Sequence, residues 1–173
     1  KLNHQPIQRG DVPHAAALDG VVRIHTRLIA RLESFRREAA GLIGGAGGGI
    51  GRAIISALLP LLPQGAQLLC VGTNAMATAA MLKSGADHAA TGENAVVVGC
   101  RRADVILGPI GIVMADALLG EITPAMAQAV AQSDARRILI PANRCDTLVV
   151  GVSAPIGTLV EQAAAAVLDG CRN

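Results

Sequence analysis

Aromatic side chains are almost absent from this sequence. Among its 173 residues Phe35 is the only aromatic one, and there is no Tyr and no Trp. Proteins that hold single-stranded nucleic acids stack the bases on aromatic rings, so the composition argues against that class. No reaction that needs a catalytic Tyr is open to the chain. The net charge of +2 is also too small to demand a nucleic acid or another polyanion as partner.

Long hydrophobic runs and closely spaced metal ligands are lacking as well. Pro, Gly, Arg or Asp interrupts every apolar stretch before it reaches the length of a membrane span, so we expect no membrane segment. His88 is the only His beyond residue 38, and the carboxylates are scattered, which predicts no metal site. No C-x-x-C joins the four cysteines, and a domain of this size needs no disulfides. We therefore expect reduced thiols and a cytoplasmic protein.

Residues 1–38 differ in character from the rest of the chain. They carry seven basic against four acidic residues, whereas residues 39–173 carry eight against nine. We place a boundary here: an N-terminal extension over 1–38, disordered in its first part, and one domain over 39–173. Asp11 and Asp19 interrupt the apolar stretch that a secretory signal needs.

Apolar residues at helical spacing predict an amphipathic helix over 18–38. Three interpretations stay open for it: a helix packed on the domain, a helix that binds a partner or membrane surface, or an extension from a misjudged start codon. Because the chain opens on Lys1 rather than Met, we expect that the native start is missing or that the chain is a fragment.

Beyond residue 38, short apolar runs alternate with turns and helical stretches. Some runs, such as 105–107, are apolar on both faces, which is typical of a parallel sheet covered by helices on both sides. The pattern predicts an α/β fold, a three-layer open sheet, mostly parallel, of about six strands. The expected strands are 39–43, 67–72, 95–99, 104–108, 136–140 and 147–152. The expected helices are 50–59, 74–84, 111–119, 124–132 and 156–169.

A glycine-rich loop, residues 44–51 (Gly-Gly-Ala-Gly-Gly-Gly-Ile-Gly), lies between the first expected strand and helix. Glycine permits positive φ and lets backbone N–H groups approach a phosphate, and the following helix points its positive end at the same place. The spacing is G-x-x-x-G-x-G, read on Gly45, Gly49 and Gly51, rather than G-x-G-x-x-G. The loop predicts a phosphate ligand; the alternative is a packing turn that binds nothing.

This loop resembles the cofactor loop of short-chain dehydrogenases, and residues 103–111 are placed like the fourth strand of that family and the loop after it. In the dinucleotide fold the first and fourth strands are neighbours, and the ligand lies across them. The resemblance does not extend to the reaction, because without Tyr the Tyr-x-x-x-Lys catalytic pair cannot exist.

The residues after the second expected strand do not decide which cofactor is bound. An NAD site usually has Asp or Glu about 20 residues past the loop, to hold the adenosine ribose. Here Thr73 and Asn74 offer a hydroxyl and an amide, and no Arg follows to pair with a 2′-phosphate. The expected cofactor is NAD or NADP, bound weakly, or the ligand is another phosphate compound.

A wider resemblance covers most of residues 42–152. Its motifs are Gly-Gly-Gly-Ile-Gly (47–51), Thr-Asn-Ala (73–75), Ala-Thr-Gly-Glu-Asn-Ala (90–95), Gly-Pro-Ile-Gly-Ile (108–112), Gly-Glu-Ile-Thr-Pro (120–124) and Asn-Arg-Cys (143–145). Together they are similar to a family of short bacterial proteins of unknown function. The resemblance implies a Rossmann-like fold and NAD(P) binding, but no reaction. Members of that family tend to have Asp-Gly-Gln where this chain has Gly44-Gly45-Ala46, so an acidic side chain is lost from the loop.

The expected site gathers the loops that follow strand ends. Its cofactor-binding residues are Gly45, Gly47, Gly48, Gly49, Ile50, Gly51, Thr73, Asn74, Gly108, Pro109, Ile110, Gly111, Asn143 and Arg144. Arg144 can pair with a phosphate, or it can be a solvated loop residue.

The candidates for catalysis are Glu93, Cys145 and Thr73. Glu93 is expected in a loop before the third strand and joins the site only if that loop folds over the top. Cys145 has no His placed to activate it, which favours an inert thiol.

The sequence does not decide between an enzyme and a binding protein. An oxidoreductase is one hypothesis. A non-catalytic module that senses nucleotide or redox state, acting through a homo-oligomer or a larger complex, is another, favoured by the small size. A lyase or transferase acting on a phosphate compound at the same edge is the third.

Overall fold

The computed structural model describes residues 41–44, 49–142 and 147–169. The predicted extension over 1–38 and its helix lie outside these residues and stay predictions. Within them the longest helix has 14 residues, and no helix is both long and apolar enough to cross a membrane.

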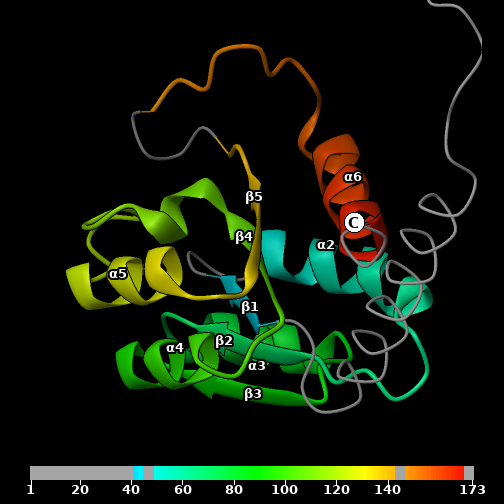
Figure 1. The fold of residues 1–173 in the computed structure, drawn as a ribbon, viewed down its shortest axis with the longest axis horizontal. Helices are drawn as coiled ribbons and strands as arrows, with labels where there is room; N and C mark the ends of the chain where they lie inside the picture. The colour runs from blue at the N-terminus through cyan, green and yellow to red at the C-terminus, as the bar shows by residue number, and fades with distance from the viewer. Residues whose placement is uncertain (1–40, 45–48, 143–146, 170–173) are drawn as a thin grey trace, which may run out of the picture.

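The centre of the domain is a parallel sheet of five strands in the order β3-β2-β1-β4-β5 (Figure 1). Gly44 of β1 pairs with Gly72 of β2, and Gly72 pairs with Thr91 of β3, so the carboxyl ends of these strands lie at one edge. The strands are β1 (Gly41–Gly44), β2 (Leu69–Gly72), β3 (His88–Thr91), β4 (Val105–Pro109) and β5 (Arg136–Ile140).

Each consecutive pair of strands is joined through a helix, as parallel pairing requires. Local signals explain two of the helix starts: the Asn74 side chain accepts a hydrogen bond from the backbone N–H of Ala77, and that of Thr123 accepts one from Met126. The helices are α2 (Gly49–Leu58), α3 (Ala75–Lys83), α4 (Glu93–Cys100), α5 (Pro124–Gln132) and α6 (Ile156–Asp169), with short 3-10 turns η2 (Leu59–Leu61) and η3 (Ile110–Val113).

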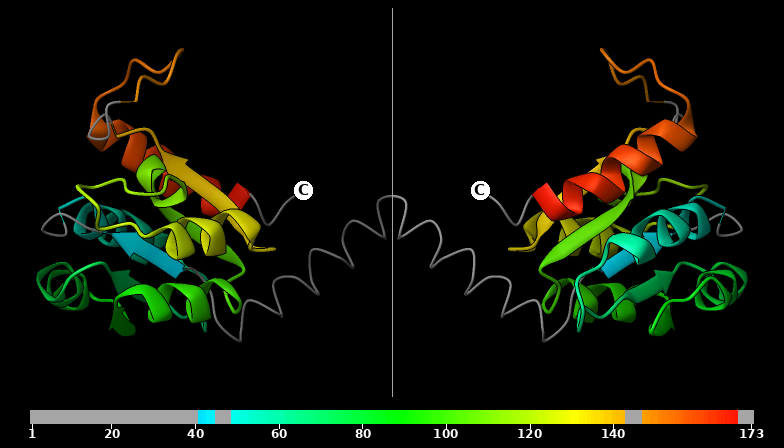
Figure 2. Two further views of the ribbon diagram at one scale, coloured as in Figure 1. Left: turned by 90° about the vertical axis from the view of Figure 1, so that its left-hand side faces the viewer. Right: turned by 90° about the vertical axis from the view of Figure 1, so that its right-hand side faces the viewer.

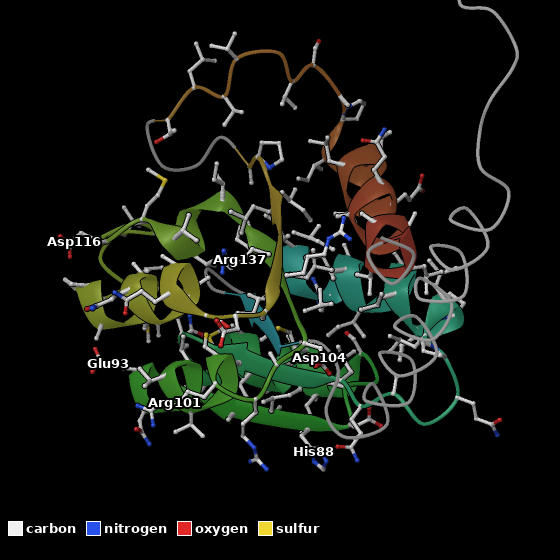
Figure 3. The ribbon with its side chains drawn as sticks, viewed as in Figure 1. His88, Glu93, Arg101, Asp104, Asp116 and Arg137 are labelled. Carbon is white, nitrogen blue, oxygen red and sulfur yellow. The ribbon has the colours of Figure 1, made fainter. Side chains whose placement is uncertain are left out.

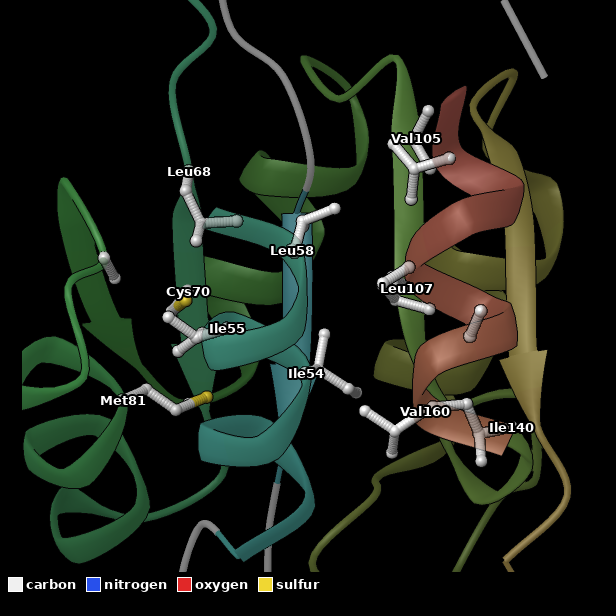
Figure 4. Packing of buried hydrophobic residues seen from close by; sticks show 14 residues of the cluster. Ile54, Ile55, Leu58, Leu68, Cys70, Met81, Val105, Leu107, Ile140 and Val160 are labelled. Carbon is white, nitrogen blue, oxygen red and sulfur yellow. The ribbon is translucent and has the colours of Figure 1, made fainter. Parts of the chain in front are cut away.

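The core divides into two clusters, one on each face of the sheet. Leu107 of β4 packs with Ile54 of α2 and Val160 of α6 (Figure 4). Its neighbour Ile106 packs instead with Val96 of α4 and with α5. Because successive strand residues point to opposite faces, this alternation shows that helices cover both sides of the sheet.

The predicted α/β class is confirmed, but the count of six strands is wrong for the described residues. The run 95–99, expected to be a strand, lies in helix α4. Val96 and Cys100 are buried one helical turn apart, and a short apolar run cannot be assigned by its periodicity alone. The third strand is instead His88–Thr91, where the sequence predicted a loop; in the structure this strand is only partly buried.

Two further expected elements differ. Residues 147–152, the expected sixth strand, form no strand. The expected helix over 111–119 is the 3-10 turn η3 followed by a loop in which Asp116, Leu118 and Leu119 have positive φ. Left-handed backbone is costly for side chains other than Gly, so local sequence did not suggest it.

Candidate functional site

The first residues of α2 form the described part of the glycine loop. Gly45, Gly47 and Gly48 lie outside the described residues, whereas Gly49, Ile50 and Gly51 begin the helix directly after them. A Cβ on Gly51 would lie 2.7 Å from the sulfur of Met81, so this glycine lets α2 pack closely on α3. Around the Cβ position of the exposed Gly49 no heavy atom of the described residues lies within 4 Å. The two glycines therefore differ: Gly51 permits close packing of two helices, whereas the space around Gly49 is not filled by the described residues.

The second glycine-containing segment continues directly from β4. Gly108 and Pro109 are the buried last residues of this strand, and Ile110 and Gly111 begin η3. Since β4 pairs with β1 in parallel, the segment leaves the sheet at the same edge as the glycine loop. The two predicted halves of the site therefore come from adjacent strands.

A carboxylate from a distant segment lies at the end of β2. The hydroxyl of Thr73 donates a hydrogen bond to Oε2 of Glu121 at 2.6 Å, and the side-chain amide of Asn74 donates to Oε1 at 3.1 Å. The same Asn74 side chain caps α3 through its oxygen, at 2.9 Å from the N–H of Ala77. Sequence reasoning found Thr73 and Asn74 but quoted Glu121 only within a motif, because 47 to 48 residues separate the partners.

Glu93 is closer to this edge than the sequence suggested. It is the first residue of α4, at the carboxyl end of β3, and not in a loop before the third strand. The hydroxyl of Thr123 donates to its Oε2 at 2.5 Å. In Figure 3, Glu93 and Asp116 lie on the same side of the molecule, next to α4 and α5. The segment after β4 is thus attached at two points, Glu121 to the end of β2 and Thr123 to the start of α4.

The junction between β2 and α3 is tight. The hydroxyl of Thr78 lies 2.7 Å from that of Thr91 and donates to the carbonyl of Asn74 at 3.0 Å. A Cβ at Gly72 would lie 2.2 Å from the Thr78 hydroxyl and 2.7 Å from its backbone nitrogen. A side chain at Gly72 would therefore displace backbone, so glycine is required there.

The loop that carries Glu121 has an unusual backbone. Asp116, Leu118, Leu119 and Gly120 all have positive φ. The N–H of Asp116 donates to the carbonyl of Ile122 at 2.8 Å, which closes the loop. Residues held in the left-handed region cost of order 1 kcal/mol each and persist only where their surroundings enforce them. The buried side chain of Ile122 provides such an anchor next to Glu121.

A family model described as a domain of unknown function, DUF3842, matches residues 40–171. The chain belongs to this family. No curated protein and no solved structure matches it. The predicted membership in a family of unknown function is therefore confirmed, and the family description names no ligand and no reaction.

The remaining predicted residues of the DUF3842 domain divide into two groups. Asn143, Arg144 and Cys145 lie outside the described residues and stay predictions. Thr73 and Glu93 are each hydrogen-bonded to a side chain of the segment after β4. No group of three potential metal ligands is found in the parts of the chain that the structure describes.

Two cysteines of the DUF3842 domain are buried. Burial, with a smaller contribution from Asp87, raises the pKa of the Cys70 thiol to about 12. Burial also raises the pKa of Cys100. Because the thiolate is the nucleophile, neither is suited to nucleophilic chemistry near neutral pH.

A pocket with a volume of about 480 Å³ lies away from this edge, between α4 and α5. Val97, Arg101, Gln128 and Ser133 are among its lining residues, and none of the predicted site residues lines it. We keep the carboxyl edge as the candidate site of the DUF3842 domain, because ligands of open α/β sheets bind where strand ends and their loops converge.

Proposed function

We propose that this protein binds a dinucleotide, NAD or NADP, or a related phosphate compound, at the carboxyl edge of a Rossmann-like sheet in the cytoplasm. One observation carries the proposal: a glycine-rich loop follows the central strand β1 and leads into α2, next to the end of β4. The strand order β3-β2-β1-β4-β5 corresponds to the dinucleotide fold without its sixth strand. In that fold the ligand lies where the chain connections diverge, here between β1 and β4.

The start of α2 supports an anionic ligand. The helix has ten residues and no acidic residue in its first turn, so its positive end is not neutralised from within. Arg52, exposed in the same turn, adds a positive charge. Among the described residues no heavy atom lies within 4 Å of a Cβ built on Gly49, and Gly51 lets the helix pack closely on α3. In the dinucleotide loop one glycine admits the pyrophosphate and another lets the helix pack closely on the sheet. Gly51 likewise permits close packing, here of α2 on α3.

The reaction, if there is one, would depend on few groups. An oxidoreductase would use Glu93, Thr73 or Cys145 as proton donor. The alternative is a non-catalytic module that senses nucleotide or redox state through an oligomer. Exposed apolar side chains favour this second candidate: Leu148 and Val150 are 81% and 88% exposed on the segment before α6.

Thermal shift and calorimetry with the full chain test the binding proposal, using NAD, NADH, NADP, NADPH, ATP and FAD. A dye is needed because the chain has no Trp or Tyr. A ligand at 100 times its Kd should raise the free energy of unfolding by about 2.7 kcal/mol. If none of these compounds shifts the unfolding temperature or releases heat, dinucleotide binding is excluded, and the glycine loop is a packing turn or a site for another phosphate compound.

A matched pair of variants locates the site. Gly49→Asp and Gly49→Asn add side chains of nearly the same shape, but only Asp adds a negative charge at the start of α2. Acidic residues stabilise a helix start, so the fold should hold in Gly49→Asp while a phosphate is repelled. We expect Gly49→Asp to abolish binding and Gly49→Asn to weaken it less. Equal binding by Gly49→Asp and the unmodified chain would place the ligand elsewhere.

Glu93→Gln distinguishes the two candidate functions once a ligand is known. Lost turnover with retained affinity indicates an enzyme. If no substrate is turned over by the unmodified chain, the sensing module remains.

A further inference from the structure

The helices α4 and α5 pack side by side (Figure 1), and the pocket of about 480 Å³ lies between them. It is lined by the last turn of α4, by one face of α5 and by the residues that follow each helix. Those residues lead into β4 and β5, so the pocket opens at the amino edge of the sheet, away from the candidate site. Its volume is within the usual range for small-molecule sites.

The floor of the pocket consists of small apolar side chains, those of Val97, Cys100, Ala103, Ala129 and Ala135. The segments after the two helices are joined beneath it. The hydroxyl of Ser133 donates to the carbonyl of Cys100 at 2.6 Å and accepts a hydrogen bond from the N–H of Ala135 at 3.1 Å. The floor is thus held in place by the fold, and an apolar group of a ligand would meet apolar surface there.

Two side chains of opposite charge line the pocket, Arg101 after α4 and Asp134 after α5. Both are exposed, and neither side chain has a hydrogen bond or ion pair with the described residues. The guanidinium presents paired donors that match a carboxylate. Asp134 follows the negative end of α5, whose last turn contains no basic residue, so a cation is favoured there. The pocket therefore has a positive side at α4 and a negative side at α5.

The other charged groups near the pocket are mostly basic. Arg137 donates to backbone carbonyls of the segment before β5, and Arg102 and Asp104 have interactions of their own. Arg136 is exposed at the start of β5 but does not line the pocket. Because α5 itself contains no charged residue, this edge is positive as a whole. It attracts a carboxylate and disfavours a ligand that is only a cation.

We propose that this pocket binds an apolar α-amino acid in its zwitterionic form. The carboxylate pairs with Arg101, the ammonium group lies toward Asp134, and the side chain covers the apolar floor. A ligand with only one of the two charges would leave the opposite side chain without a partner. The inference goes beyond the proposed function and does not depend on it, because the pocket and the carboxyl edge share no residue.

Calorimetric titration of the full chain with L-leucine, L-methionine and L-phenylalanine tests the proposal. Concentrations up to about 10 mM reveal binding with a Kd up to about 1 mM. We expect at least one of the three to bind. L-asparagine, which is similar in size to leucine but has a polar side chain, should bind at least about tenfold more weakly than leucine, because its amide would lose its contacts with water. No binding of the three apolar amino acids overturns the proposal.

Analogues that lack one charge test the zwitterion with the unmodified chain, so their result does not depend on folding of a variant. For leucine they are 4-methylpentanoic acid, without the ammonium group, and 3-methylbutylamine, without the carboxylate. Both should bind about tenfold more weakly than leucine, and the amine should be the weaker of the two. If the acid binds as tightly as leucine, the pocket does not recognise an amino acid and the proposal is wrong.

Variants that remove a charge locate the two contacts. Arg101→Gln should weaken amino-acid binding about tenfold, and Asp134→Asn about fivefold, since hydrogen bonds between charged groups are the strong ones. Lys83→Gln and Glu161→Gln remove charges at exposed positions of α3 and α6 and should leave the affinity unchanged. Equal affinities of Arg101→Gln and Lys83→Gln would overturn the role of Arg101.

A second pair of variants tests the pocket itself. Ala129→Leu places a larger side chain on the floor and should abolish amino-acid binding. Ala131→Leu makes the same change at an exposed position of α5 that does not line the pocket, and it should bind as the unmodified chain does. Binding that both variants retain would show that the amino acid is bound elsewhere, which also overturns the proposal.

Discussion

The ends of β2 and β5 lie at the same edge of one sheet, but the chain segments that follow these two strands differ in how closely the domain holds them. After β2, Thr73 and Asn74 hold Glu121, and Thr78 meets Thr91 at 2.7 Å. Before α6, residues 148–155 form an arm that stands away from the body of the domain in the views of Figures 1 and 2. Its Leu148 and Val150 are largely exposed.

This difference indicates which of the two segments is suited to binding a ligand and which to contacting another molecule. The polar groups after β2 are oriented by the fold itself, which is what a binding site requires. The arm contains three consecutive apolar residues, 148–150, but forms no strand. Larger exposed apolar patches often mark contacts with another molecule. The expected homo-oligomer stays a prediction that this arm makes easier to test.

The largest expected effect comes from closing the space at the end of β2. Gly72→Ala would place a Cβ 2.2 Å from the Thr78 hydroxyl and 2.7 Å from backbone. We expect the free energy of unfolding to fall by about 3 kcal/mol, measured by urea denaturation followed by circular dichroism. Gly99→Ala is the control, since its Cβ would meet only ordinary contacts at 3.5 Å or more. Equal stability of the two variants would show that the residues around Gly72 are not closely packed.

Alkaline pH gives a smaller effect on the same strand. In the folded state the pKa of Cys70 is raised to about 12 from its ordinary value of 9.0. The thiol ionises first in the unfolded chain, so the stability that it contributes is complete below pH 9 and is lost as pH rises toward 12. We expect a loss of roughly 1 kcal/mol by pH 10.

Denaturation midpoints between pH 8 and 11 measure this loss, and the absence of Tyr removes the commonest competing titration. Cys70→Ala should flatten the pH dependence. If the denaturation midpoint of that variant depends on pH as strongly as before, burial does not raise the pKa of the Cys70 thiol in the folded state.

The arm should give the smallest effect. Leu148→Ser combined with Val150→Ser removes side chains that are already exposed, so the free energy of unfolding should change by less than about 0.5 kcal/mol. Leu107→Ala, fully buried on β4, should cost about 3 kcal/mol under the same conditions. A loss above 1 kcal/mol for the double variant that grows with protein concentration would show that an oligomer buries the arm.

Local signals predicted much of the chain. Thr123-Pro124 is a strong helix start, and α5 has the bounds that the sequence predicted, as do β5 and α6. The run 95–99 was assigned wrongly, because four or five apolar residues satisfy a buried strand and a helix face equally well. The edge strand β3 was missed, because its four residues, His-Ala-Ala-Thr, include no large apolar side chain.

The sequence by itself determined that this is an α/β domain of the DUF3842 family with a glycine-rich loop before α2, because glycine, proline and capping residues act on their near neighbours. Only the tertiary structure decided that Glu121 lies at the end of β2 and Glu93 at the end of β3. Those positions follow from the parallel alignment of the strand ends and from the left-handed loop before Glu121. A contact between residues 47 positions apart, such as Asn74 and Glu121, cannot be read from the local periodicity of the sequence. Only the packing of the folded chain brings these two side chains together.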